Sequence, residues 1–75
     1  MKRVQAMQYF FHVRRGNVIY EDMIGVEFPG MTEAASHARA EVAAILRDEP
    51  EVPAELQSIE IADGTGKVVH TVQFA

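Results

Sequence analysis

Three histidines account for most of the chemistry that this chain of 75 residues could offer. His12 and His70 lie in segments that alternate like β-strands, and a glutamate is expected across the sheet from His12. A carboxylate that orients an imidazole is the arrangement from which general bases are built, but it is also an ordinary cross-strand pair. No recognisable motif places a nucleophile or a metal beside either histidine. We therefore expect no catalytic residue among them.

The other candidate sites have structural explanations. His37 is flanked by Glu33 and Glu41 at i,i+4 spacing, which is typical of an exposed, salt-bridged helix. "DGTGK", residues 63–67, lacks the spacing of a phosphate loop and the repeated acids of a calcium loop, so it predicts a type I turn that begins at its aspartate. The chain has no cysteine and no HxxxH or HExxH pair. We expect no metal, no cofactor and no enzymatic activity.

The charge of the chain is unevenly distributed. Its formal net charge is −4, from 7 basic and 11 acidic residues. Four of the bases and none of the acids fall within residues 1–20: Lys2, Arg3, Arg14 and Arg15. An acidic composition argues against nucleic-acid binding, which depends on neutralising phosphates. No apolar stretch is long enough for a signal peptide or a membrane helix, so we expect a cytoplasmic protein without membrane association.

The hydrophobic pattern predicts a single α+β domain over residues 8–75, preceded by an N-terminal extension over residues 1–7. An alanine-rich helix is expected to begin at an N-cap on Thr32 and to end before Pro50. The result is a ββαββ fold in which one helix packs on one face of a four-stranded, mainly antiparallel sheet. Its strands are expected at residues 8–14, 18–22, 57–63 and 68–74, with further extended residues at 26–28.

The turn chemistry fixes the register of the first hairpin. Gly16 and Asn17 tolerate the positive φ angles of a two-residue turn. That turn predicts three cross-strand pairs: Val13 with Tyr20, Arg14 with Ile19, and His12 with Glu21. The register of His70 stays open, because a bulged turn places it opposite Glu60 and a shift of one residue places it opposite Ile59.

The two faces of the sheet are expected to differ. Tyr9, Phe11 and Val13 alternate onto the face that packs against the helix stripe of Ala35, Ala38, Val42 and Ile45. One helix cannot cover both faces, so the opposite face is expected to be bare. Exposed apolar patches mark association surfaces, and a small domain gains burial by pairing with a second copy. The candidate interface residues on this face are Phe10, His12, Arg14, Ile19 and Glu21, with Met23 as an apolar neighbour.

The segment "MQYFFHVRRGNVIYEDMIGVEFPGMTEAASHARAEV" resembles an uncharacterised family of short bacterial proteins, a domain of unknown function. Members typically open on Tyr-Phe-Phe-His and a glycine turn, and continue with an aspartate, a glycine and a Val-Glu-apolar stretch before an alanine-rich helix. The closing "ADGTGKVVHTVQF" is similar to the hairpin that ends the family. The resemblance covers the chain from Met7 onward, supports the fold and the compartment, and implies no activity. The matching residues are Tyr9, Phe10, Phe11, His12, Gly16, Asp22, Gly25, Val26, Glu27 and Phe28, with Ala34, Ala35 and Ala38 in the helix.

A shorter stretch suggests a second resemblance. "EFPGMTEAASHA", residues 27–38, is similar to the strand-Pro-Gly helix entry of HicB-type antitoxins, although the loop usual between the glycine and the helix is absent. The sequence therefore predicts a cytoplasmic, non-enzymatic association module that forms a homodimer, with another protein as a further partner class. The alternative is a HicB-like antitoxin or another nucleic-acid-linked regulator.

Overall fold

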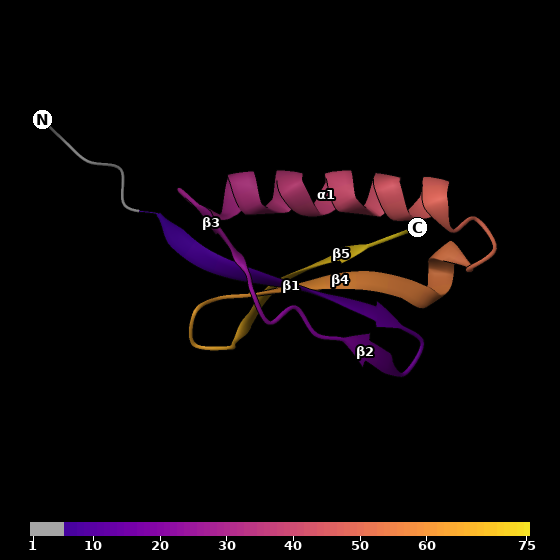
Figure 1. Cartoon of the computed structure of the whole chain (residues 1–75), viewed down its shortest axis with the longest axis horizontal. Helices are drawn as coiled ribbons and strands as arrows, with labels where there is room; N and C mark the ends of the chain where they lie inside the picture. Colours follow the sequence, from indigo (N-terminus) through magenta and orange to yellow (C-terminus); the bar gives the residue numbers. More distant parts are fainter. Residues whose placement is uncertain (1–5) are drawn as a thin grey trace, which may run out of the picture.

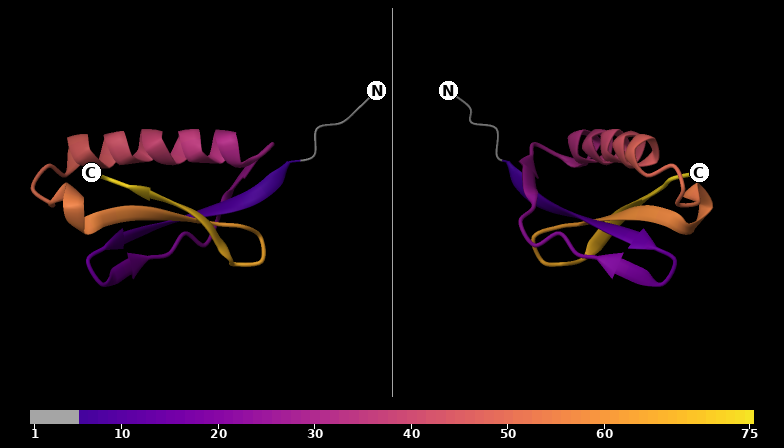
Figure 2. Two further views of the ribbon diagram at one scale, coloured as in Figure 1. Left: turned by 180° about the vertical axis from the view of Figure 1, so that it is seen from behind. Right: turned by 45° about the vertical axis from the view of Figure 1, so that its right-hand side comes forward.

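A computed structural model describes residues 6–75 of the chain. One helix lies along one side of the sheet and the opposite side is left without a covering layer (Figures 1 and 2). The α+β class predicted from the sequence is confirmed. The elements in chain order are β1 (Met7–Arg15), β2 (Val18–Tyr20), β3 (Val26–Phe28), α1 (Met31–Asp48), the 3-10 turn η1 (Ala54–Leu56), β4 (Gln57–Ala62) and β5 (Val68–Gln73).

The sheet has five strands rather than the four expected, in the order β2-β1-β4-β5 with β3 also paired to β1. β2 pairs antiparallel with Val13–Arg15, and β3 pairs antiparallel with Met7–Tyr9. The segment that joins them hydrogen-bonds to the N–H of Phe11, between the two paired stretches. β2 and β3 therefore follow one another along a single edge of β1. The extended residues at 26–28 form a true strand, so the order is βββαββ rather than ββαββ.

The first hairpin has the predicted register as far as β2 extends. Val13 lies opposite Tyr20 and Arg14 lies opposite Ile19. The expected pair of His12 with Glu21 is wrong, because β2 ends at Tyr20 and Glu21 is already outside the ladder. Across the other edge of β1, His12 lies opposite Glu60 of β4.

The closing hairpin has a bulge that decides the register of His70. Between the pairs Ile61–His70 and Ala62–Val68, β5 contains one extra residue. Neither predicted partner of His70 is correct, because the bulge moves His70 opposite Ile61 and leaves Glu60 opposite Thr71. The turn before β5 is as predicted: the N–H of Gly66 donates to the carbonyl of Asp63 at 3.0 Å.

The predicted helix N-cap at Thr32 is wrong. α1 begins at Met31, and its N-cap is Gly30 in an extended conformation. The carbonyl of Gly30 accepts the first helical hydrogen bond, from the N–H of Ala34 at 3.2 Å. Thr32 thus lies inside the first turn, where its side chain cannot serve as the cap.

The core lies between α1 and the sheet face turned toward it. Ala34, Ala38 and Val42 of α1 are buried at four-residue spacing, whereas Ala35, expected in that stripe, is only half-buried. Alanines at this contact allow the helix backbone to approach the strands closely. The other core residues are Tyr9, Phe11, Ile59, Ile61 and Phe74.

No helix within residues 6–75 has the length and apolarity needed to cross a membrane.

Candidate functional site

Alternate residues of β1 point away from α1 and form part of what we call the bare face. Tyr9 and Phe11 are buried under the helix, so the intervening side chains of Phe10, His12 and Arg14 lie on the opposite side. Ile19 lies opposite Arg14 in the ladder and shares its face. Four of the five candidate interface residues are therefore brought together on the bare face. The fifth, Glu21, is exposed in the loop that follows β2.

The centre of the bare face contains an ion pair. The Nε of Arg14 donates to Oε2 of Glu60 at 2.7 Å, with 41% of the arginine side chain and 18% of the glutamate side chain exposed. Beside the pair, the rings of Phe10 and His12 are stacked with an interplanar angle of 7° and centroids 6.5 Å apart. The middle of this face is thus nearly neutral, and its polar groups are satisfied by one another.

Residues 21–25, which we call the Asp22 turn, interrupt the strand between β2 and β3. Oδ2 of Asp22 accepts the N–H of Phe11 at 3.1 Å, which replaces the backbone partner that β1 lacks at this point. Oδ1 of the same carboxylate accepts the N–H groups of Ile24 and Gly25, both at 3.0 Å. One side chain therefore closes the turn on itself and ties it to the central strand.

The hydrogen bonds also set the electrostatics of Asp22. Partial burial by itself raises the pKa of this carboxyl group, but the N–H groups of Gly25, Phe11 and Ile24 stabilise the charged form more strongly. The net result is a pKa below the ordinary value for aspartate. The carboxylate is thus kept ionised by the backbone groups that it organises.

Three bare-face side chains of β1 hold the Asp22 turn in place. The backbone N–H of Asp22 donates to Nδ1 of His12 at 3.0 Å, so His12 is oriented by this backbone group rather than by Glu21. Nε2 of Gln8 donates to the carbonyl of Ile24 at 3.0 Å. A Cβ on Gly25 would lie 3.0 Å from the ring of Phe10, so the turn also covers part of that ring.

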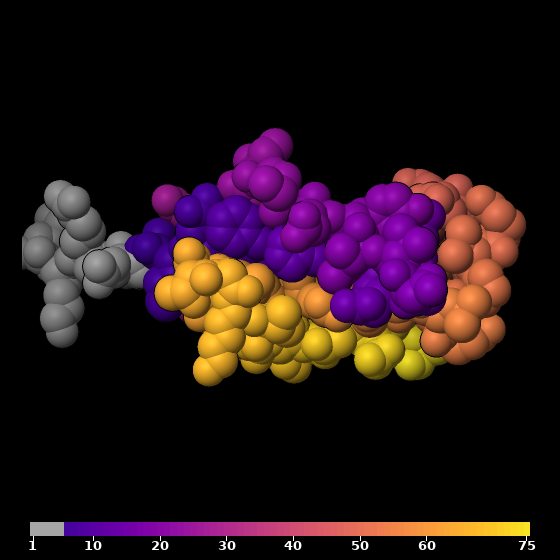
Figure 3. Space-filling view, turned by 90° about the horizontal axis from the view of Figure 1, so that it is seen from below, coloured from indigo at the N-terminus to yellow at the C-terminus, as the bar shows by residue number. Residues whose placement is uncertain are grey.

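Because Gln8, Phe10 and His12 all point to the bare face, the Asp22 turn lies on that side of β1. Its two apolar side chains project into solvent: Met23 is 80% exposed and Ile24 is 83% exposed. Figure 3 shows the bare face, with the magenta segment between β2 and β3 protruding beside the indigo β1. A turn held by polar hydrogen bonds thus presents two large apolar groups on the side of β1 where Ile19, nearer the hairpin end, is 37% exposed.

The other two histidines lie on the helix side of the sheet. His37 was expected on the solvent face of the helix, but its ring packs 4.8 Å from the ring of Phe11 and 5.2 Å from that of Phe28. Its predicted contact with Glu41 is present, with Nε2 to Oε1 at 3.1 Å. His37 lies at the edge of the contact between helix and sheet because Ala34 and Ala38, three and one residues away, are two of the buried positions of α1. His70 is exposed beside a hollow between β5 and α1.

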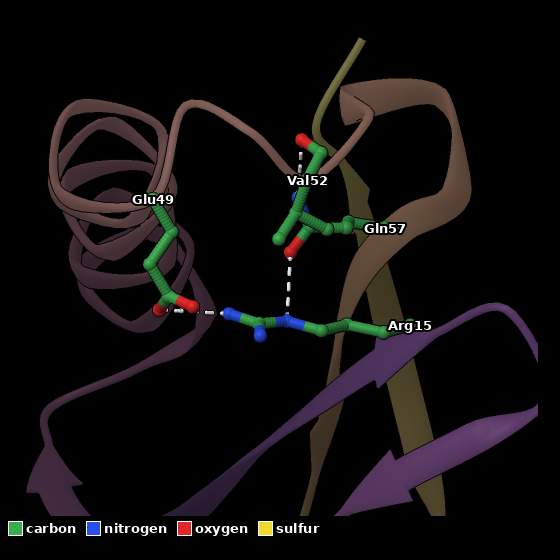
Figure 4. Close-up of polar contacts among 4 residues, drawn as sticks. All are labelled: Arg15, Glu49, Val52 and Gln57. Atoms are coloured by element: carbon green, nitrogen blue, oxygen red, sulfur yellow. Dashed lines mark hydrogen bonds and ion pairs between the residues drawn. The ribbon is translucent and has the colours of Figure 1, made fainter.

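A second polar cluster joins β1 to the end of α1, and nothing in the sequence singled it out. Nη2 of Arg15 donates to Oε2 of Glu49 at 2.9 Å, and its Nε donates to Oε1 of the buried Gln57 at 3.0 Å (Figure 4). The hydrogen bond with Glu49 raises the pKa of Arg15 and lowers that of Glu49. The Arg15 guanidinium lies 5.6 Å from the ring centroid of Tyr20, and together they border a hollow of about 230 Å³.

The described part of the chain offers little for catalysis. Within residues 6–75, no three His, Cys, Asp or Glu side chains are grouped closely enough to hold a metal ion. Nδ1 of His12 is occupied by a backbone N–H, and the carboxylate of Asp22 is occupied by three more. What the arrangement does provide is a rigid apolar projection beside a neutral sheet face, which is suited to contact with another macromolecule.

Comparison with known families matches residues 8–75 to a domain of unknown function, DUF6894. The chain belongs to the DUF6894 family. The resemblance to a domain of unknown function expected from the sequence is therefore confirmed. No match was found among curated proteins or among solved structures. In this DUF6894 domain, four residues that carried the resemblance meet in one structural unit: Phe11, His12, Asp22 and Gly25.

Proposed function

We propose that this DUF6894 domain is a non-enzymatic association module that acts in the cytoplasm and docks a second copy through its bare face. The observation that carries the proposal is the exposure of Met23 and Ile24 on the Asp22 turn. Four hydrogen bonds hold the carboxylate and N–H of Asp22, so the two apolar side chains are presented by a fixed backbone. Burying side chains that are already positioned avoids the entropic cost of ordering a loop on binding.

The energetic gain from such a contact is appreciable. Full burial of a side chain such as isoleucine or methionine is worth roughly 1.5–3 kcal/mol. In an isologous dimer the same patch is buried twice, so the contribution of Ile24 and Met23 doubles. Ile19 extends the apolar surface toward the hairpin end of the sheet.

The charges of the bare face favour a second copy as the occupant. Arg14 and Glu60 are paired within one chain, so two identical faces meet without bringing unpaired like charges together. The remaining acids near the face, Glu21 and Glu27, are exposed at its edge, where solvent screens them. The described residues in the middle of this surface have no unpaired charge that would attract a strongly charged partner.

The same ion pairs weigh against the nucleic-acid alternative. Of the four bases that give the opening of the chain its positive charge, Arg14 is paired with Glu60 and Arg15 with Glu49. Lys2 and Arg3 lie outside the described residues. Because Arg14 and Arg15 are already neutralised by glutamates, the described part of residues 1–20 has little positive charge left to bind phosphates.

The proposal is tested by the molar mass of the protein in solution. Size exclusion coupled to light scattering should give a mass above that of one chain for wild type, rising with concentration, and a smaller mass at the same concentration for Ile24→Asp. Ile24 is a better test than Phe10, because the Phe10 ring is part of the packing against Gly25 and its replacement would disturb the fold. Ala40→Asp on the exposed side of α1 adds the same charge away from the sheet and should behave as wild type.

The result that would contradict the proposal is equally clear. If wild type and Ile24→Asp have the same mass at about 1 mM, a concentration at which even weak specific contacts are occupied, the bare face does not dock a second copy.

A further inference from the structure

β5 forms the outer edge of the sheet on the side away from β2 and β3. The N–H of Phe74 donates to the carbonyl of Gln57 across the β4–β5 ladder. In an antiparallel ladder the backbone groups of successive residues point alternately toward and away from the neighbouring strand. His70 and Val72 therefore bond to β4, and the N–H and C=O groups of Thr71 and Gln73 point outward from the sheet.

This edge lacks the features that normally prevent strands from pairing. Exposed edges are usually protected by charged side chains, proline or an interruption of the strand. The opposite edge of this sheet has such protection, because the Asp22 turn interrupts it and Glu21 and Glu27 flank it. β5 contains no Lys, Arg, Asp, Glu or Pro over its 6 residues, and its bulge lies at its beginning. Val68 and Val69 are 44% and 42% exposed there.

We infer that β5 pairs antiparallel with β5 of a second copy, around a two-fold axis at Thr71. Outward-pointing residues must meet outward-pointing residues, which restricts the possible registers. The register centred on Thr71 places the central hydrogen-bonded pair in the regular part of β5, away from the bulge. It also brings the two threonine side chains opposite each other, a favourable cross-strand pair, and places each Val72 opposite His70 of the other copy.

The contact extends the sheet rather than covering it. The two-fold axis is perpendicular to the sheet, so both helices lie on one side and the two bare faces join into one larger surface. This inference does not rest on the bare-face contact, because the two contacts use different residues. A contact limited to one pair of strands falls below the roughly 1,200 Å² of stable interfaces, so we expect a dissociation constant of roughly 0.1 mM.

Amide hydrogen exchange measured by NMR tests this edge directly. The amides of Thr71 and Gln73 should exchange roughly four times more slowly at about 1 mM protein than at about 10 µM. For that dissociation constant, the fraction of chains that are monomeric falls by about this factor between the two concentrations. The amides of His70 and Val72, bonded to β4, should be protected at both concentrations. Ile24→Asp should leave this pattern unchanged, which separates the edge contact from the bare-face contact.

Variants at Thr71 provide the controls. Thr71→Pro removes one outward N–H without removing a bond to β4, and should abolish the concentration dependence at Gln73. Thr71→Lys places like charges at the two-fold axis and should have the same effect even if the proline variant does not fold. Thr71→Val keeps the N–H and should retain the contact. Thr71 and Gln73 amides that exchange at the rate of an unstructured peptide at about 1 mM, or protection of Gln73 that survives in the folded proline or lysine variant, would overturn the inference.

Discussion

The carboxylate of Asp22 should be one of the most sensitive positions for the stability of this domain. Asp22→Ala removes the acceptor for the N–H groups of Phe11, Ile24 and Gly25. Hydrogen bonds to a charged acceptor are worth roughly 1.5–3 kcal/mol each when sheltered. The N–H of Ile24 is exposed and can bond to water instead, whereas that of Phe11 is part-buried. We therefore expect a net loss of about 2–3 kcal/mol.

The loss is large for a domain of this size. At roughly 0.1 kcal/mol per residue, the whole fold is stabilised by less than about 10 kcal/mol. Each kcal/mol shifts the Tm of so small a domain by roughly 4–8 °C, so a loss of about 2–3 kcal/mol in Asp22→Ala should lower the Tm by roughly 8–24 °C. The Tm of Asp22→Asn should lie between those of wild type and Asp22→Ala. Its amide oxygen can keep the hydrogen bonds within the turn, but its NH₂ group faces the N–H of Phe11 and cannot accept from it.

Thermal unfolding and urea titration, followed by circular dichroism, provide the assay. Asp63→Ala is the matched control, since that carboxylate also accepts three hydrogen bonds but only within its own exposed turn, from Thr65 and Lys67. It should lower the Tm much less. Equal losses for Asp22→Ala and Asp63→Ala would refute the argument that the Asp22 turn supports β1.

The same carboxylate predicts a pH dependence. The pKa of Asp22 is lower in the folded protein than its ordinary value of 3.8, so the folded state binds its proton less readily than the unfolded state does. Its stabilisation is fully present above that ordinary value and is lost as the pH falls through the lowered folded pKa. The difference in stability between wild type and Asp22→Asn should therefore be constant near neutral pH and shrink in acid. A difference that persists unchanged at pH 2, below the ordinary aspartate range, would contradict the assignment.

Three further outcomes are expected. Gly25→Ala should destabilise the fold by at least about 2 kcal/mol, measured by urea titration, because Gly25 has a φ of +78° and an added Cβ would lie 2.9 Å from a β1 carbonyl oxygen; Gly64→Ala, with no atom within 4 Å, should not. Glu49→Gln should lower the Tm slightly at low salt, because it removes the negative charge that pairs with Arg15. The difference should disappear near about 1 M salt, because this ion pair is partly exposed and salt screens it. Titration of labelled DNA and RNA near physiological salt should show only weak, salt-sensitive binding, and sub-micromolar affinity there would favour the antitoxin alternative.

Local turn chemistry made much of this fold predictable from the sequence. The turn at Gly16 and Asn17 has few possible geometries, so it fixed the pairing of Val13 with Tyr20. The alternation of Phe10 with its buried neighbours placed the two faces of β1 correctly. The helix was equally clear, since its apolar positions recur at a spacing that strands do not show.

The errors arose where one side chain replaces regular backbone pairing. Asp22 accepts three backbone N–H groups across a gap in the ladder, and hydrophobic periodicity does not report such a contact. A signal was present: an aspartate with a glycine three residues later, as in Asp22 and Gly25, is typical of an Asx-type turn. The bulge before His70 could not be read in the same way, because the residues around it suit several registers equally well.

Docking of a second copy on the bare face is best detected by mapping which amide NMR signals move when the protein is diluted. A series from about 1 mM to about 10 µM spans the range in which weak specific dimers dissociate. We expect the signals of Ile19, Met23 and Ile24 to shift together with concentration and to stop shifting in Ile24→Asp, while those on the exposed side of α1 stay fixed. Signals of the Asp22 turn that stay constant over the whole series would contradict docking on the bare face.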